Sequence, residues 1–246
     1  MPNKDHAPQP PTTHTGVYIV TGASRGIGYQ TALELAYLGE TVVAIARNES
    51  ALEKLRKNAP EKILIKPLDL SNFSSFQHLA HKLQEDHLHI KGLVNNAGTL
   101  TNKPFLDTEE LDWASQFRLN AIAPALLTRA LVPLMTSGAH VLNISSMGGY
   151  QGSSKFPGLS AYSASKGALA ILTESLAVEL SHLNISSNCL CIGAVQTEML
   201  EQAFPGIQAP VTAAQMGSYI ADFVRTGHTL YNGRILPVAL SDPDKG

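Results

Sequence analysis

Short runs rich in β-branched residues alternate with longer stretches of helical spacing along most of this chain. The runs typical of strands are 17–21, 41–46, 63–66, 92–95, 140–145, 185–192 and 234–238. The stretches typical of helices are 29–38, 50–58, 73–85, 113–135, 161–182 and 212–225. This order predicts an α/β fold with a Rossmann-like, doubly wound parallel sheet of about seven strands and helices on both faces. Ligands bind such sheets at the carboxyl ends of the strands, so we expect the chemistry at the strand-to-helix junctions.

The length and composition favour one domain behind a short tail. A chain of 246 residues with 44% hydrophobic residues can bury one substantial core, and no internal linker divides it, so we expect a single domain over residues 16–246. Residues 1–15 contain four prolines and no apolar stretch, which predicts a disordered tail. This tail lacks the apolar core of a secretory signal and the arginine-rich pattern of a mitochondrial presequence, so we expect a cytoplasmic protein.

Charge, hydropathy and cysteine spacing exclude several classes of function. A net charge of -2 with interspersed signs predicts no nucleic-acid partner. The longest apolar region, 121–135, is interrupted by Arg129 and is too short to span a bilayer comfortably, so we expect no membrane partner. Cys189 and Cys191 lie two apart on a predicted strand, where an unstrained disulfide is unfavourable, and we interpret them as small buried hydrophobes. The nine histidines have no paired spacing, so we expect no metal site.

The first predicted strand runs directly into a glycine-rich loop that precedes a helix. Residues 21–28 read Thr-Gly-Ala-Ser-Arg-Gly-Ile-Gly. Glycines let the backbone turn tightly and let a pyrophosphate approach without meeting a Cβ, and the helix start donates N–H groups to the anion. The loop therefore predicts a dinucleotide cradle, with an ordinary glycine-rich turn as the alternative. Its candidate binding residues are Gly22, Ser24, Arg25, Gly26, Ile27 and Gly28.

The choice of nucleotide depends on the end of the second predicted strand. A site for NAD is expected to place an acidic residue about twenty residues past the loop, on the ribose hydroxyls. This chain has Arg47 there, between Ala46 and Asn48. A carboxylate would repel the additional phosphate of NADP, whereas a guanidinium binds it with charge-assisted hydrogen bonds. Arg47, together with Arg25, therefore predicts NADP (NADPH) as the cofactor, and two solvated surface charges are the alternative.

A tyrosine and a lysine open the fifth long helical stretch. Tyr162 and Lys166 are four residues apart, which puts the phenol and the ammonium on one face of a helix. A free phenol with a pKa near 10 exchanges protons poorly at neutral pH, and a nearby cation lowers that pKa by about 1–3 units. The pair therefore predicts an acid/base centre, and a surface contact is the alternative.

The loop motif Thr-Gly-x-x-x-Gly-x-Gly and the pair Tyr-x-x-x-Lys resemble the single-domain branch of the short-chain dehydrogenase/reductase family, over residues 17 to about 238. The resemblance implies an NADP(H)-dependent oxidoreductase that transfers a hydride between the nicotinamide and a ketone, an aldehyde or a secondary alcohol. It implies that Tyr162 is the general acid/base and that Lys166 also binds the nicotinamide ribose. It further implies that Ser146 binds the substrate oxygen and that Asn120 supports a proton-relay water. Because neighbouring strand residues face opposite ways, Ser145 is the alternative to Ser146.

The resemblance also assigns the remaining cofactor contacts. It implies that Asp69 and Leu70 lie at the adenine, although Ser71 capping the next helix and Asp69 complementing its N-terminus would explain these residues equally well. Small residues at Asn96, Ala97 and Gly98 would let the backbone lie against the cofactor. Val195 and Thr197 are the candidate contacts of the carboxamide.

The substrate end departs from the family pattern. The usual Pro-Gly after the sixth strand is replaced by Ile192-Gly193, and segment 198–210 is short, so we expect an open pocket. Lys155 is a candidate contact of an acidic substrate. The candidate apolar wall consists of Met147, Tyr150, Phe156, Leu159, Met199 and Phe204.

Two further expectations concern assembly and turnover. The long stretches 113–135 and 161–182 are apolar over much of their circumference, which favours a homodimer or homotetramer. A catalytically silent NAD(P)-binding regulatory protein is the alternative function. The partner is expected to be a small-molecule carbonyl or alcohol substrate, whose identity the sequence leaves open.

Overall fold

A computed structural model describes residues 15–240, and seven parallel strands form its central sheet. Their spatial order is β3-β2-β1-β4-β5-β6-β9. The strands are β1 (Thr15–Thr21), β2 (Thr41–Ala46), β3 (Ile63–Pro67), β4 (Leu88–Asn95), β5 (Met135–Ser146), β6 (Ser186–Ile192) and β9 (Ile235–Val238). The predicted fold class is therefore confirmed, whereas the predicted tail lies outside the described residues except for Thr15, with which β1 begins.

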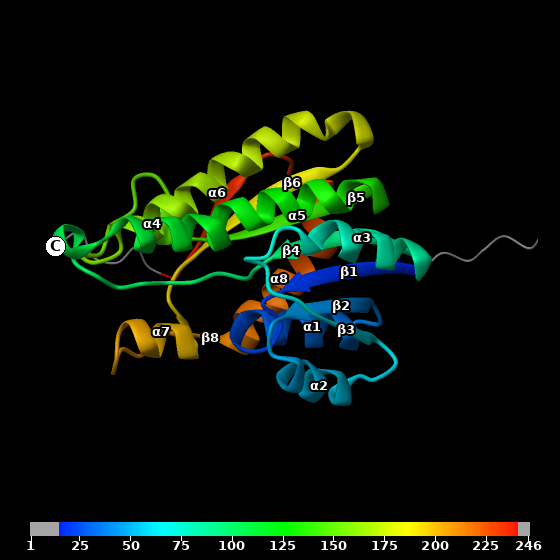
Figure 1. The fold of residues 1–246 in the computed structure, drawn as a ribbon, viewed down its shortest axis with the longest axis horizontal. Helices are drawn as coiled ribbons and strands as arrows, with labels where there is room; N and C mark the ends of the chain where they lie inside the picture. The colour runs from blue at the N-terminus through cyan, green and yellow to red at the C-terminus, as the bar shows by residue number, and fades with distance from the viewer. Residues whose placement is uncertain (1–14, 241–246) are drawn as a thin grey trace, which may run out of the picture.

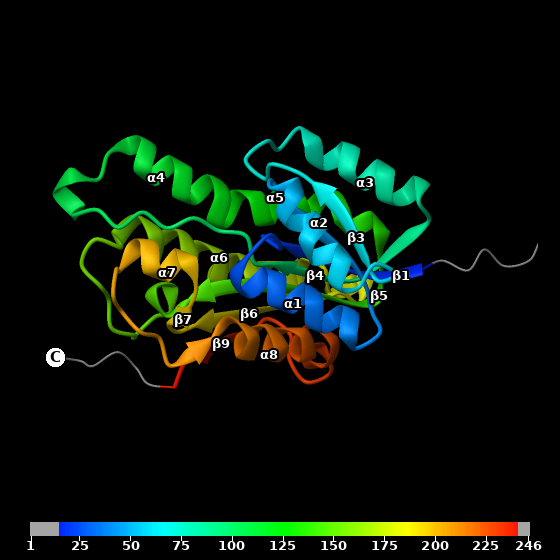
Figure 2. The same ribbon diagram turned by 90° about the horizontal axis from the view of Figure 1, so that it is seen from below.

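Helices cover both faces of the sheet (Figure 1 and Figure 2). One face carries α1 (Gly26–Tyr37), α2 (Glu49–Asn58) and α8 (Ala213–Thr226), packed on a core that includes Val20, Val42 and Leu190. The other face carries α3 (Ser75–Glu85), α4 (Glu110–Phe117), α5 (Ala123–Leu131) and α6 (Ser160–Glu179). The strands are thus buried on both sides, which explains their continuous apolar character.

The strand order reverses between β1 and β4. From β1 the chain continues outward through β2 and β3, whereas β4 begins the opposite half of the sheet. The connections that follow β1 and β4 therefore lead to helices on opposite faces of the sheet, and a crevice opens beside them at the carboxyl ends of the strands. A small separate sheet lies at the same end, formed by β7 (Val195–Gln196) and β8 (Val211–Thr212), with the short helix α7 (Glu198–Ala203) between them.

The stretch predicted to be helical over 113–135 is helical as far as Leu134, but it is not one regular helix. The chain instead forms α4, a π-helical turn (Arg118–Ile122), α5, a 3-10 turn (Val132–Leu134) and then β5, which begins at Met135. Pro133 cannot continue a regular helix, and this accounts for the early end. Asn120, whose side-chain bonds are described below, lies within this π-turn. Among the described helices, none combines the length and apolar character that a membrane span requires.

Candidate active site

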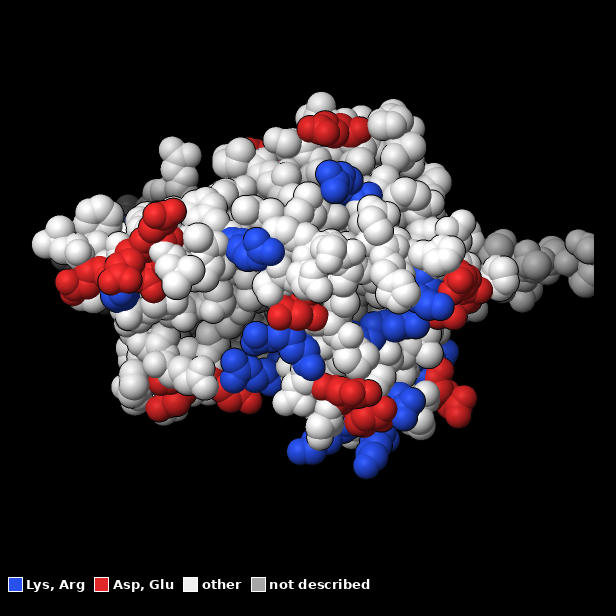
Figure 3. Space-filling view, viewed as in Figure 1, with Lys and Arg blue, Asp and Glu red and all other residues white. Residues whose placement is uncertain are grey.

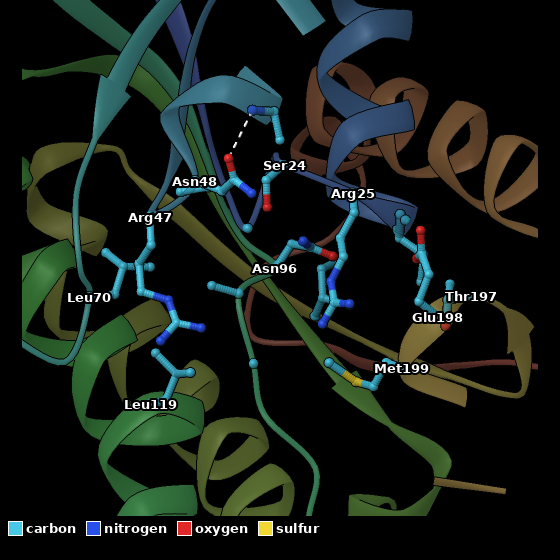
Figure 4. Close-up of a pocket in the computed structure, with 18 of the residues that line it drawn as sticks. Ser24, Arg25, Arg47, Asn48, Leu70, Asn96, Leu119, Thr197, Glu198 and Met199 are labelled. Carbon is cyan, nitrogen blue, oxygen red and sulfur yellow. Dashed lines mark hydrogen bonds between the residues drawn. The ribbon is translucent and has the colours of Figure 1, made fainter. Parts of the chain in front are cut away.

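A cleft of about 480 Å³ opens at the carboxyl ends of the central strands (Figure 4). Most of the predicted site residues line it. These are Gly22, Ser24, Arg25, Gly26, Ile27, Arg47, Asp69, Leu70, Asn96, Ala97, Gly98, Tyr162, Lys166 and Thr197. Four predicted residues do not line it, namely Gly28, Asn120, Ser146 and Val195. Other lining residues were not predicted, among them Asn48, Ala51, Leu68, Leu119, Ile144, Ile192 and Glu198.

The glycine loop has the shape that an approaching phosphate requires. Gly22 and Gly26 adopt φ values of 69° and 56°, which residues with a Cβ rarely adopt. Helix α1 begins at Gly26, three residues earlier than predicted, and Arg25 at its N-cap makes no side-chain capping bond. The first N–H groups of α1 are therefore open to an anion. Gly28 serves packing instead, because a Cβ there would lie 2.5 Å from the carbonyl oxygen of Gly22.

Thr21 joins the two loops that flank the crevice, a role that was not predicted. Its hydroxyl oxygen accepts hydrogen bonds from the backbone N–H groups of Asn96 and Ala97, each at 3.0 Å. The amide nitrogen of Asn96 donates to the carbonyl oxygen of Thr21 at 2.9 Å. These bonds hold the loop after β4 against the loop after β1. The sequence signal for this role is the position of Thr21 as the first residue of the glycine motif.

Arg25 and Arg47 extend into the cleft from opposite sides of Asn96 (Figure 4). Both side chains are exposed. Arg47 lies between the end of β2 and α2, whose first turn is capped by Asn48 accepting from the N–H of Ala51 at 3.0 Å. Two guanidinium groups thus line the nucleotide cleft, while the carboxylate expected of an NAD site is absent from the end of β2.

Asp69 is occupied within its own loop. One carboxylate oxygen accepts from the backbone N–H and the hydroxyl of Ser71, at 2.9 and 2.8 Å, and these bonds hold the pKa of Asp69 below its ordinary value. Ser71 does not cap the following helix, because α3 begins only at Ser75. The capping alternative for Ser71 is therefore wrong. Arg118 secures the loop by donating twice to the carbonyl oxygen of Ser71 and stacking on the ring of Phe73.

The two serines at the end of β5 face opposite ways. The Ser146 hydroxyl hydrogen-bonds the side chain of Tyr162 and accepts from the N–H of Gly148 at 3.1 Å. The Ser145 hydroxyl donates instead to the backbone carbonyl of Lys166 at 2.8 Å. The structure therefore brings Ser146, rather than Ser145, to the phenol.

Burial controls the titration of both Tyr162 and Lys166. Burial raises the pKa of Tyr162, and the hydrogen bond from Ser146 partly opposes this increase. Burial lowers the pKa of Lys166 to about 8. The ammonium nitrogen donates to the carbonyl oxygen of Ile144 at 2.8 Å. The prediction that Lys166 lowers the pKa of Tyr162 is thus wrong for this structure, because desolvation of the phenol dominates.

Asn120 supports the site from behind the cleft. Its amide oxygen accepts from the N–H of Thr99 at 2.8 Å, and its amide nitrogen donates to the carbonyl of Thr99 and to the hydroxyl of Ser165, each at 2.9 Å. Ser165 in turn donates to the backbone carbonyl of Tyr162 at 2.7 Å. Asn120 is fully buried. Through these hydrogen bonds it connects the loop after β4 to the start of α6.

The predicted apolar wall is present in part. Met199 lines the cleft, and the rings of Phe156 and Phe204 contact each other with centroids 6.3 Å apart. Met147 and Leu159 are buried.

Lys155 and Val195 do not meet the cleft. The Lys155 ammonium donates to Ser153 and to the carbonyl of Tyr150, at 2.7 and 2.5 Å, and it does not line the cleft. Val195 belongs to β7, and its side chain is buried in the core.

The segment after β6 forms one wall of the cleft. Thr197 caps α7 by accepting from the N–H of Leu200 at 3.3 Å, and the next two residues, Glu198 and Met199, also line the cleft. Cys189 and Cys191 on β6 are free and buried, as predicted. Residues 15–240 contain no group of three potential metal ligands.

Comparisons with known proteins agree with this architecture. The family model of short chain dehydrogenases matches residues 16–208. The cyclopentanol dehydrogenase of Comamonas testosteroni is 33% identical over 200 residues, 78% of each chain. The crystal structure of acetoin dehydrogenase YohF from Salmonella typhimurium superposes with a TM-score of 0.81 at 27% identity, over 94% of this chain and 99% of that one. A 4-hydroxyisoleucine dehydrogenase mutant complexed with NADH and succinate shares the fold, with a TM-score of 0.82 at 22% identity over 92% and 98% of the two chains.

Proposed function

This chain belongs to the short-chain dehydrogenase/reductase family, and on that premise we propose that it is an NADP(H)-dependent oxidoreductase acting on a ketone, an aldehyde or a secondary alcohol. The observation that carries the proposal is the position of Tyr162. Its phenol meets the hydroxyl of Ser146 and lines the same cleft as the glycine loop and Lys166.

The residues of the cleft suit a nicotinamide dinucleotide. A Cβ at Gly22 would lie 2.9 Å from the Cα of Ala97, so only a glycine leaves the two loops their close approach. The start of α1 presents open N–H groups, and the ammonium of Lys166 lines the inner end. When bound, the cofactor would supply or accept the hydride at its nicotinamide ring.

The residues of this chain would manage the proton. In reduction, the Ser146 hydroxyl would donate a hydrogen bond to the carbonyl oxygen, and the Tyr162 hydroxyl would transfer its proton to that oxygen. Lys166 would bind the ribose hydroxyls of the cofactor. Because burial raises the pKa of Tyr162, the phenol is protonated at neutral pH, which favours its role as the acid in carbonyl reduction.

The preference for NADP rests on two cations. Arg25 and Arg47 line the cleft, and no acidic side chain follows β2 at the position where NAD would need one. Asp69 does not replace it, because its carboxylate is bound to Ser71. The guanidinium groups would hold the additional phosphate of NADP by charge-assisted hydrogen bonds.

Two measurements test this function together. The first is the dissociation constant of NADPH and of NADH, for which we expect the tighter binding with NADPH. The second is the loss of NADPH absorbance against a panel of aldehydes and ketones, for which we expect turnover of at least one compound. Tighter binding of NADH would contradict the cofactor preference. Binding without turnover of any compound would favour a silent regulatory protein instead.

Further parts of the proposal concern the setting of the enzyme. We propose a cytoplasmic homo-oligomer whose residues 16–246 form one dinucleotide-binding and catalytic domain. The outward face of α6 supports assembly, because Ile171 and Val178 are 61% and 76% exposed. On the face shown in Figure 3, positive and negative side chains are interspersed, which supports a small-molecule partner rather than nucleic acid.

A further inference from the structure

Helix α7 places a carboxylate at the start of α1. Glu198 is the first residue of α7, directly after the N-cap Thr197, and its side chain points toward the first turn of α1 (Figure 4). One carboxylate oxygen of Glu198 lies 3.7 Å from the position that a Cβ would occupy at Gly26. The acidic group therefore approaches the backbone of the glycine loop where that backbone has no side chain.

No salt bridge within the described residues explains the position of the Glu198 carboxylate. Within residues 15–240, Glu198 forms no ion pair with a lysine, arginine or histidine. The start of α1 lies beside the carboxylate instead, and its N-cap Arg25 provides no side-chain acceptor. This helix start carries partial positive charge, so it favours an anion at this point.

The same helix start is where the proposed cofactor needs its pyrophosphate. Ser24, Arg25 and Gly26 line the cleft together with Glu198. A pyrophosphate brings negative charge to the N–H groups of α1, close to the carboxylate of Glu198, and like charges repel. We infer that Glu198 competes with the pyrophosphate of the nicotinamide cofactor for the start of α1 and thereby weakens cofactor binding. This inference rests on the proposed function.

A neighbouring cavity gives the displaced carboxylate a place to go. A second cavity of about 550 Å³ adjoins the cleft, and Gly26, Thr197 and Glu198 border both. The side-chain amides of Gln30 and Gln202 line that second cavity and offer hydrogen-bond donors. Glu198 can thus turn away from α1 when the cofactor enters, and helix α7 does not need to unfold.

Equilibrium titration of the cofactors tests the inference directly. Dissociation constants of NADPH and NADH are measured by nicotinamide fluorescence for the wild type, for Glu198→Gln and for Glu61→Gln. Glu61 is exposed and lies before β3, at the opposite end of the sheet from the cleft, so its variant removes one charge far from the site. Thermal unfolding checks that all three proteins are folded.

We expect Glu198→Gln to bind both cofactors about three- to tenfold more tightly than the wild type. The ratio of the two dissociation constants is expected to stay the same, because NADPH and NADH share the pyrophosphate. The gain is expected to shrink at high ionic strength, which screens the repulsion in the wild type. Glu61→Gln is expected to stay within twofold of the wild type.

The possible failures separate the inference from the function. Unchanged or weaker binding by Glu198→Gln, with a wild type that binds cofactor, overturns the inference alone. An equal gain in Glu61→Gln also overturns it, because the effect would then follow net charge rather than position. If neither the wild type nor Glu198→Gln binds either dinucleotide, the proposed function fails, and the inference fails with it.

Discussion

The ammonium nitrogen of Lys166 donates a hydrogen bond to the carbonyl oxygen of Ile144 across a distance of 2.8 Å. Lys166 is 4% exposed, so this backbone oxygen replaces much of the water that would otherwise solvate the charge. The replacement is incomplete, because burial still lowers the pKa of Lys166 to about 8. The charge that the cofactor would meet at the inner end of the cleft therefore depends on pH.

The first prediction is that cofactor binding weakens above neutral pH. Lys166 is a cation below a pKa of about 8 and is neutral above it, so its attraction for the anionic cofactor is lost as the pH rises from 7 to 9. Titration of NADPH across this range should show the dissociation constant increasing by about three- to tenfold. Lys166→Met should bind more weakly at pH 7 and lose this pH dependence. If Lys166→Met kept the full pH dependence of cofactor binding, the titrating group would be a residue other than Lys166.

The second prediction separates the two serines. Removing a hydrogen bond that lowers the pKa of Tyr162 must raise that pKa further, so Ser146→Ala should shift the pH profile of alcohol oxidation to higher pH. It should also reduce kcat by about 10²–10³-fold, the usual cost of removing one hydrogen-bond donor to a substrate oxygen. Ser145→Ala is the matched control, because Ser145 bonds the backbone of Lys166 and not the phenol. The assignment of Ser146 would be wrong if the shift appeared in Ser145→Ala instead.

The third prediction concerns the nucleotide. Arg47→Asp replaces a cation in the cleft with a carboxylate that repels the additional phosphate of NADP and can accept from ribose hydroxyls. The ratio of the NADH to the NADPH dissociation constant should fall by about 10–100-fold, as expected for losing a charge-assisted hydrogen bond. Arg56→Ala is a suitable control, because that arginine is exposed on α2 and pairs with Glu53. An unchanged ratio in Arg47→Asp would show that Arg47 is a solvated surface charge.

Much of the site could be predicted because its residues are close together in the sequence. The glycine loop, the end of β2 and the pair of Tyr162 and Lys166 each lie within one junction, so the strand-helix alternation was enough to bring them to one edge of the sheet. The family resemblance placed Ser146 ahead of Ser145, because the strand period of two residues requires only that the two neighbouring serines face opposite ways.

The remaining features depend on contacts between distant segments. Apolar periodicity continues across Asn120, but the bonds of its side chain to Thr99 and Ser165 accompany a π-turn in place of a regular helix. Helix α7 has only six residues, which is too short for periodicity to reveal, and Glu198 was missed with it. The pKa of Tyr162 is set by the protein packed around it, and the spacing to Lys166 carries no information about that burial.

The fourth prediction is a loss of stability in mild acid. His140 is fully buried, with Nδ1 3.1 Å from the carbonyl oxygen of Val224 and Nε2 3.0 Å from the amide nitrogen of Asn188. Burial, and to a smaller extent His228, lower its pKa to about 4 from the ordinary 6.5. The unfolded chain therefore takes up a proton as the pH falls below 6.5, while the folded chain does so only near pH 4.

The contribution of His140 to the free energy of unfolding should thus be fully retained above pH 6.5. Between pH 6.5 and pH 4, the protonation of His140 should lower the free energy of unfolding by about 3 kcal/mol. Denaturant unfolding of the wild type and His140→Gln at pH 7, 6 and 5 measures the effect, and the difference between the two proteins cancels the carboxylates that titrate in both. If the free energy of unfolding had the same pH dependence in both proteins, His140 would be ruled out as the source of the lost stability.

The central claim is that Tyr162 transfers the proton in a cleft that binds the cofactor independently of it. The most direct measurement is NADPH-dependent reduction of a carbonyl substrate by the wild type and by Tyr162→Phe, with the dissociation constant of NADPH determined for both. We predict a kcat lower by about 10²–10⁴-fold in Tyr162→Phe and a dissociation constant within about threefold of the wild type. A Tyr162→Phe enzyme with the kcat of the wild type would contradict the account.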